Sequence, residues 1–127
     1  MSDPIKSVVP FLQRLPDLSG VVVTGDMNAR QVGATTVYVY LENGYEFLRD
    51  VGDRVYLAYE VYSLDREEAA DLSLVVRRNL LRGLRSVQEG SLYFLDSHDE
   101  EYPVYEPDDS SREHVYAGVV SLYCQEV

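Results

Sequence analysis

The sequence predicts an α+β fold, a mostly antiparallel sheet with one long and one short helix packed on one face. Several segments rich in β-branched and aromatic residues are separated by short turns, which is typical of antiparallel strands. One long stretch, residues 65–89, instead repeats apolar residues every three or four positions, as an amphipathic helix does. Strands grouped apart from helices favour the α+β class, and 127 residues suit a single domain over positions 1–127.

The first expected element is a short helix that opens at Asp3-Pro4 and ends before Pro16. Proline suits the first turn of a helix, and apolar residues then recur at helical spacing. A strand is expected at 21–24. Residues 25–34 have no apolar period and predict a loop.

Three strand segments are expected in the middle of the chain. Residues 35–42 are rich in valine, threonine and tyrosine, and the Asn43-Gly44 dipeptide that follows favours a two-residue hairpin turn. The returning strand would be 45–48, and Asp50-Val51-Gly52-Asp53 is expected to turn the chain again. The clearest strand is 54–62, because its apolar residues alternate in period two.

The long helix is expected over residues 65–89, ending at Gly90. Asp65 and Glu68 have the spacing of a capping box. The apolar stripe expected to face the sheet consists of Ala69, Leu72, Val76, Leu80, Leu84 and Val87.

The C-terminal part predicts a strand at 92–95, an acidic loop at 98–111 and a final strand at 113–124. Cys124 shares a strand face with Val120 and Leu122, so it is expected to be a small core residue. A single cysteine excludes an internal disulfide framework and a multi-thiolate zinc site.

The charge balance disfavours several classes of partner. With 22 acidic and 11 basic residues the net charge is −11, whereas binding to a phosphate backbone or an anionic membrane requires cations. The N-terminus lacks the basic-then-apolar pattern of a signal peptide, and apolar runs are too short to cross a bilayer, so no membrane association is expected.

Catalytic and metal-binding motifs are not found in the sequence. It contains no Gly-rich phosphate loop and no H-E-x-x-H, and its two histidines, His98 and His114, are expected to be exposed. The carboxylates from Asp96 to Glu101 are hard oxygen ligands but lack the spacing of an EF-hand. We therefore expect no catalytic residues, no metal and no cofactor.

Two features exceed what an ordinary soluble domain needs. The chain has 11 tyrosines and no tryptophan, and tyrosine is enriched at protein interfaces as well as on half-buried sheet faces. Charge is also segregated, since eight acids lie between positions 96 and 113 while the end of the long helix is basic. This predicts a head-to-tail contact in which the acidic loop of one copy meets a free basic helix face of the next, through Arg78, Arg82, Arg85, Asp99, Glu100, Glu101, Tyr102, Tyr105, Asp108 and Asp109.

The layout resembles the tail terminator, or tail completion, proteins of long-tailed bacteriophages, which are also grouped with minor tail or neck proteins. The resemblance is carried by RVYLAYEVYSLDREEAADLSLVVRRNLL (54–81), by the preceding LENG (41–44), and by PDDSSR (107–112) leading into VYAGVVSLYC (115–124). It covers nearly the whole chain in order and length.

The resemblance implies a structural virion protein of the tail or neck, made in the host cytoplasm, without catalysis. Such proteins form a ring, usually a homohexamer, on the last ring of tail-tube protein. The ring stops tube polymerisation and presents the surface that joins the head completion or connector protein. DNA passes through it without specific binding, and an acidic character suits that passage because it repels phosphate.

Two other hypotheses come from different classes of protein. One is a small cytoplasmic α+β enzyme or ligand-binding domain whose acidic loop holds a metal. The other is an acidic mimic of DNA, which would spread its acids over a face instead of concentrating them in one loop.

Overall fold

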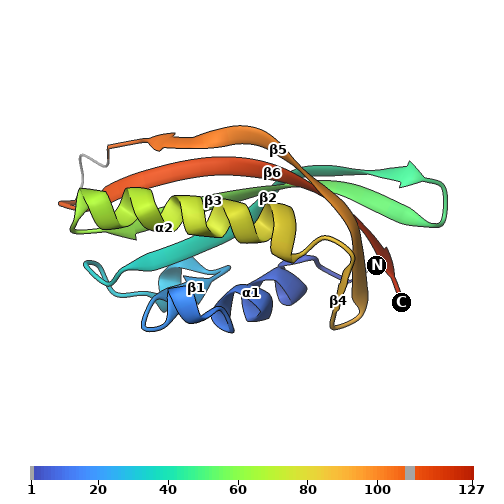
Figure 1. Ribbon diagram of the computed structural model, residues 1–127, viewed down its shortest axis with the longest axis horizontal. Coiled ribbons are helices and arrows are strands. Elements are labelled where there is room, and N and C mark those ends of the chain that lie inside the picture. Colours follow the sequence, from blue (N-terminus) through green and yellow to red (C-terminus); the bar gives the residue numbers. More distant parts are fainter. Residues whose placement is uncertain (1, 108–110) are drawn as a thin grey trace.

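The computed structural model of the protein, shown in Figure 1, describes residues 2–107 and 111–127. The fold belongs to the α+β class, as predicted. The elements follow one another as α1 (Ile5–Gln13), the 3-10 turn η1 (Pro16–Leu18), β1 (Val22–Thr24), the 3-10 turn η2 (Met27–Ala29), β2 (Thr36–Leu48), β3 (Gly52–Ser63), α2 (Arg66–Arg78), the π-helical turn η3 (Asn79–Gly83), β4 (Val87–Glu89), β5 (Leu92–Tyr105) and β6 (His114–Glu126).

The six strands form one sheet in the order β1-β2-β3-β6-β5-β4. The β1–β2 pairing is parallel and the other four pairings are antiparallel, so the sheet is mixed. It also curls into a half-barrel instead of forming a flat layer (Figure 1). Long twisted strands account for the curl, helped by the register shifts in the β2–β3 and β5–β6 pairs, because each bulge bends its strand.

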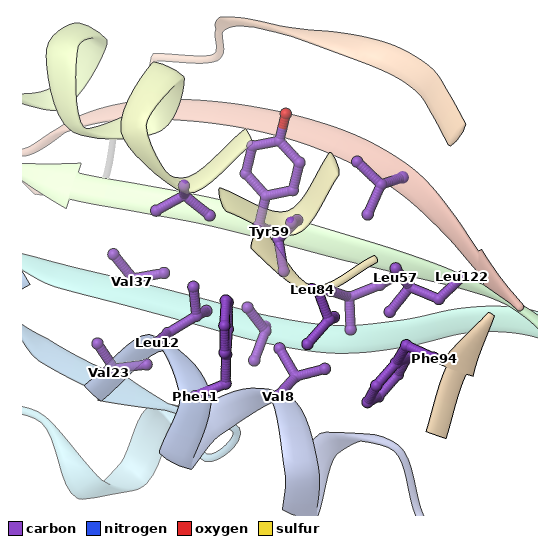
Figure 2. Close-up of a cluster of buried hydrophobic side chains, with 14 of the residues drawn as sticks. Val8, Phe11, Leu12, Val23, Val37, Leu57, Tyr59, Leu84, Phe94 and Leu122 are labelled. Atoms are coloured by element: carbon purple, nitrogen blue, oxygen red, sulfur yellow. The ribbon is translucent and has the colours of Figure 1, made fainter. Parts of the chain in front are cut away.

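Both helices pack against the same side of the sheet, inside the half-barrel. Figure 2 shows Val8, Phe11 and Leu12 of α1 beside Leu57 of β3 and Leu84 at the end of η3, within one cluster of buried side chains. Val76 and Leu80 of the expected helical stripe are also fully buried, and Leu72 is partly buried. The prediction that this stripe faces the sheet is confirmed for these residues.

Cys124 is a core residue, as the alternation of its strand predicted. Its side chain is fully buried in the main cluster. Burial raises the pKa of the thiol to about 11, so the thiolate is disfavoured at neutral pH.

The long helix is shorter than predicted. The α-helix ends at Arg78, and one π turn, closed by the bond from the Leu84 amide to the Asn79 carbonyl, carries the helical path on to Gly83. Ser86 then takes a positive φ of 61°, which breaks the helix, and the following residues pair with β5 as β4. Gly90, expected to end the helix, instead has the positive φ needed in the tight β4–β5 turn.

The Asn43-Gly44 dipeptide is not a hairpin turn, contrary to the prediction. It lies inside β2, next to a register shift after Leu41, where the Asn43 side chain accepts a hydrogen bond from the Gly44 amide. The chain reverses only at residues 49–51, which overlap the second turn predicted at 50–53, and Asp50 there has a φ of 59°. The β2–β3 hairpin is therefore longer than predicted, and its turn lies at one end of the molecule beyond the helices (Figure 1).

The expected acidic loop at 98–111 is largely a strand. β5 extends to Tyr105 and pairs with β6 along its length, with register shifts that take up Pro103 and other extra residues. A proline is tolerated there because it lies at a ladder irregularity. The acidic run hid this strand because its side chains point to solvent and break the apolar alternation.

Gly118 of β6 is required by the side chain that crosses it. Tyr59 is fully buried, and a Cβ atom at position 118 would clash with its hydroxyl oxygen and lie 2.8 Å from the Glu101 carbonyl oxygen. Two crowded atoms, one of them backbone, leave no room for a methyl group.

Gly118→Ala is therefore expected to lower the free energy of unfolding by about 1–3 kcal/mol, the usual cost of overpacking. Tyr59→Phe is the matched control, because the Tyr59 hydroxyl is buried with no hydrogen-bond partner among the described residues. Its removal should be neutral or stabilising. Urea titration measures both, and a Gly118→Ala protein as stable as the unmodified chain would contradict the crowding.

Candidate assembly surfaces

The sequence predicts that acidic residues of one copy meet basic residues of the next copy. In the structure these residues lie on several different elements. Asp99, Glu100, Glu101, Tyr102 and Tyr105 lie on β5, not in a loop. Asp108 and Asp109 lie outside the described residues. Of the three arginines, Arg78 ends α2, Arg82 lies in η3, and Arg85 follows the helix.

Several of these charges pair within the chain. The Arg85 Nε lies 2.8 Å from an Asp96 oxygen, and Arg77 contacts Asp99 through two nitrogens. The hydrogen bond from the Ser97 amide lowers the pKa of Asp96, and the charge of Arg85 lowers it further. The basic end of the helix and the acidic segment therefore partly pair with each other inside one molecule.

The prediction of a free basic face formed by Arg78, Arg82 and Arg85 is therefore wrong in part. Arg85 is committed to Asp96 and to the Ser97 carbonyl, and it lies outside the helix. Arg78 lies 3.6 Å from Asp17, with both side chains more than half exposed, a distance at which the pair contributes little. Arg82 has no ion pair among the described residues.

A shallow depression lies on the surface formed by α2 and η3. We call it the helix patch, and it is lined by Leu74, Arg77, Arg78, Leu81 and Arg82. Leu74 is 40% exposed. The helix patch therefore combines an apolar centre with a cationic rim.

The helix-free face of the sheet carries a second feature, which we call the acidic groove. Its volume is about 300 Å³. The buried side chains of Ala58 and Val119 lie at its floor. Four carboxylates and two tyrosines are among the side chains that line it: Glu42, Glu60, Glu101, Glu106, Tyr40 and Tyr102.

The electrostatics of the acidic groove are dominated by its carboxylates. Burial, reinforced by the charges of Glu60 and Glu42, raises the pKa of Tyr40 to about 12. The Tyr62 hydroxyl donates a 2.7 Å hydrogen bond to Glu60, which orients that carboxylate. No arginine or lysine is among the described residues that line the groove.

The tyrosines expected to supply interface area differ in their surroundings. Tyr105 is packed within its own chain, with its hydroxyl 2.9 Å from the His114 Nδ1 and the Arg66 guanidinium over its ring. Tyr102 is 57% exposed, with Arg77 over one side of its ring. Of these two tyrosines, Tyr102 is the one with a substantial exposed area.

The end of the β2–β3 hairpin is a third surface that the sequence did not indicate. We define the hairpin tip as residues 46–53. Leu48 and Val51 there are 49% and 52% exposed, and the carboxylates of Glu46, Asp50 and Asp53 line one depression together with Val51. The sequence predicts a turn at 50–53, but the additional turn expected at Asn43-Gly44 hid the long hairpin that ends here.

The described residues contain no group of three or more histidine, cysteine, aspartate or glutamate side chains arranged to hold a metal ion. Within the same residues no helix has the length and hydropathy needed to cross a membrane. Neither protein-family models nor curated proteins give a match to the chain.

Proposed function

We propose that the protein is a tail terminator of a long-tailed bacteriophage. In this proposal copies form a ring, usually of six, on the last ring of tail-tube protein. The ring stops tube polymerisation and provides the surface that joins the head completion or connector protein. It performs no catalysis and belongs to the tail or neck of the virion.

The observation that carries the proposal is the acidic groove on the helix-free face. A ring through which DNA passes needs a surface that does not hold phosphate, and binding to phosphate depends on lysine and arginine. The four groove carboxylates, without a lysine or arginine among the described lining residues, provide such a surface. We infer that this face lines the channel, so that each copy adds the same carboxylates around the DNA.

The arrangement of the helices supports the same orientation. α1 and α2 cover the opposite side of the sheet and leave the acidic groove open. With the sheet toward the channel, the helices and the hairpin tip are free to meet neighbouring copies and other tail or head proteins. The resemblance of the 54–81 block to tail terminators supports the proposed function and carries no information on which face lines the channel.

The direct test is a phage that lacks the gene for this protein. Without a terminator, tube growth has no stop signal, so electron microscopy should show tails of uncontrolled length that are not joined to filled heads. Supplying the protein from a plasmid should restore tails of uniform length. Tails of normal length attached to heads in its absence would refute the proposal.

A further inference from the structure

We propose that copies of this chain join head to tail, with the hairpin tip of one copy seated on the helix patch of the next. The inference deepens the proposed function, because it names the contact from which the ring is built. It revises the contact expected from the sequence, since the acidic partner is the β2–β3 turn and not the 98–111 segment.

The two surfaces are complementary in chemistry. The hairpin tip presents Val51, about half exposed, beside the carboxylates of Glu46, Asp50 and Asp53. It also carries one cation, Arg49, and half-exposed Leu48, which borders a separate depression. The helix patch presents Leu74 and partly buried Leu81 within a rim of arginines. An apolar centre with a charged rim is the usual anatomy of a protein interface.

Charge complementarity is the reason for assigning a second copy of the chain as the occupant of the helix patch. A chain with a net charge of −11 repels its own copies unless an association brings its few cations against carboxylates. Arg82, without an ion pair among the described residues, and the weakly paired Arg78 are the cations of the helix patch available for this purpose. The hairpin tip supplies carboxylates together with exposed apolar area.

The placement of the surfaces fits a heterologous contact. Figure 1 shows the β2–β3 turn at one end of the molecule, away from α2, so the tip of a chain does not cover its own helix patch. When two copies join through two different surfaces, the pair still has one free hairpin tip and one free helix patch. Such contacts close into a ring when the rotation between neighbours permits.

Cross-linking between two single-cysteine proteins tests the contact directly. The native Cys124 is buried, so Val51→Cys and Leu74→Cys each add one exposed thiol. Mixing the two full-length proteins with a short bismaleimide should give a covalent dimer containing one chain of each kind. Val32→Cys, at an exposed valine in the 31–34 turn, replaces Val51→Cys in the control and should give at least tenfold less product with Leu74→Cys.

Charge reversal gives an independent measurement by sedimentation at low salt. Arg82→Glu should raise the dissociation constant of the oligomer about tenfold or more, because it places a carboxylate among carboxylates. Lys6→Glu changes the net charge equally, on the exposed surface of α1, and should have little effect. Adding Glu46→Arg to Arg82→Glu should recover part of the affinity.

The inference is overturned if the native chain stays monomeric at about 100 μM, if Arg82→Glu behaves like Lys6→Glu, or if cross-linking does not distinguish Val51→Cys from Val32→Cys. A native monomer whose hairpin tip binds tail-tube protein would likewise assign the tip to another partner. These results differ from a failure of the proposed function, which the tails made without the gene report. A ring built from other surfaces would leave tail termination intact.

Discussion

Replacing Glu113 with alanine is expected to lower the free energy of unfolding by about 3–5 kcal/mol, because it leaves a buried guanidinium without its counter-charge. The side chains of Arg30 and Glu113 are only 5% and 2% exposed. They form a bidentate ion pair, in which two guanidinium nitrogens donate to the two carboxylate oxygens. Charges removed from water in this way depend on each other for stabilisation.

Other contacts extend this pair into a local network. The Arg30 Nε donates to the Thr36 hydroxyl at 2.8 Å, and a terminal nitrogen donates to the Ala34 carbonyl at 2.9 Å. The Gly33 amide donates to Glu113, and the guanidinium lies over the Tyr62 ring. The network fixes the 30–36 segment against the start of β6. Glu113→Ala therefore removes the acceptor of several donors at once.

Urea titration with Glu106→Ala as the control tests this expectation. Glu106 is an exposed acid in the same connection, and its loss should change stability by less than about 0.5 kcal/mol. The double variant Arg30→Met with Glu113→Leu should be less destabilised than Glu113→Ala alone, because no unpaired charge remains. A Glu113→Ala protein within about 1 kcal/mol of the unmodified chain would show that the guanidinium does not need this carboxylate.

The Arg30–Glu113 pair illustrates what the sequence does not reveal. The two residues are 83 positions apart, and neither belongs to a periodic pattern. In the sequence alone, Glu113 is one acid of an acidic run and Arg30 is one residue of a predicted loop. Their encounter depends on β2, β3 and β6 lying side by side in the sheet, a long-range property that no local pattern encodes.

Local periodicity predicted well where burial is strong. The 54–62 strand and the stripe through Val76, Leu80 and Leu84 were recognised because one face of each is apolar and fully buried. Prediction failed where special residues act in an unusual context. Asn43-Gly44 lies at a bulge, Gly90 in a hairpin turn, and the 98–105 acids on a strand with solvated side chains.

The candidate surfaces were predicted less well than the fold. Charge segregation along the chain was correctly recognised, but Arg77 and Arg85 meet Asp99 and Asp96 within the same molecule. Which charges are used internally depends on where the helix ends and how β5 pairs. The acidic groove arises only when strands distant in sequence lie next to one another. The hairpin tip was missed because a turn was expected at Asn43-Gly44, inside β2.

Truncating Leu80 to alanine is expected to lower the free energy of unfolding by about 2–5 kcal/mol, the range for fully buried leucines whose removal leaves a cavity. Leu80 is fully buried in the cluster that joins both helices to the sheet. It lies in the π turn, whose wider winding continues the helix with both Leu80 and Leu84 toward the core.

Leu64→Ala is the matched control, because Leu64 precedes α2 and is 58% exposed. It should change stability by less than about 0.5 kcal/mol in the same urea titration. The slope of the titration should be unchanged in both variants, since neither alters the surface exposed on unfolding by much. A loss of less than about 0.5 kcal/mol in Leu80→Ala would contradict the expectation, because it would mean that the Leu80 side chain does not pack in the core. If instead the slope fell with the midpoint, the truncation would have loosened the packing of α2 on the sheet.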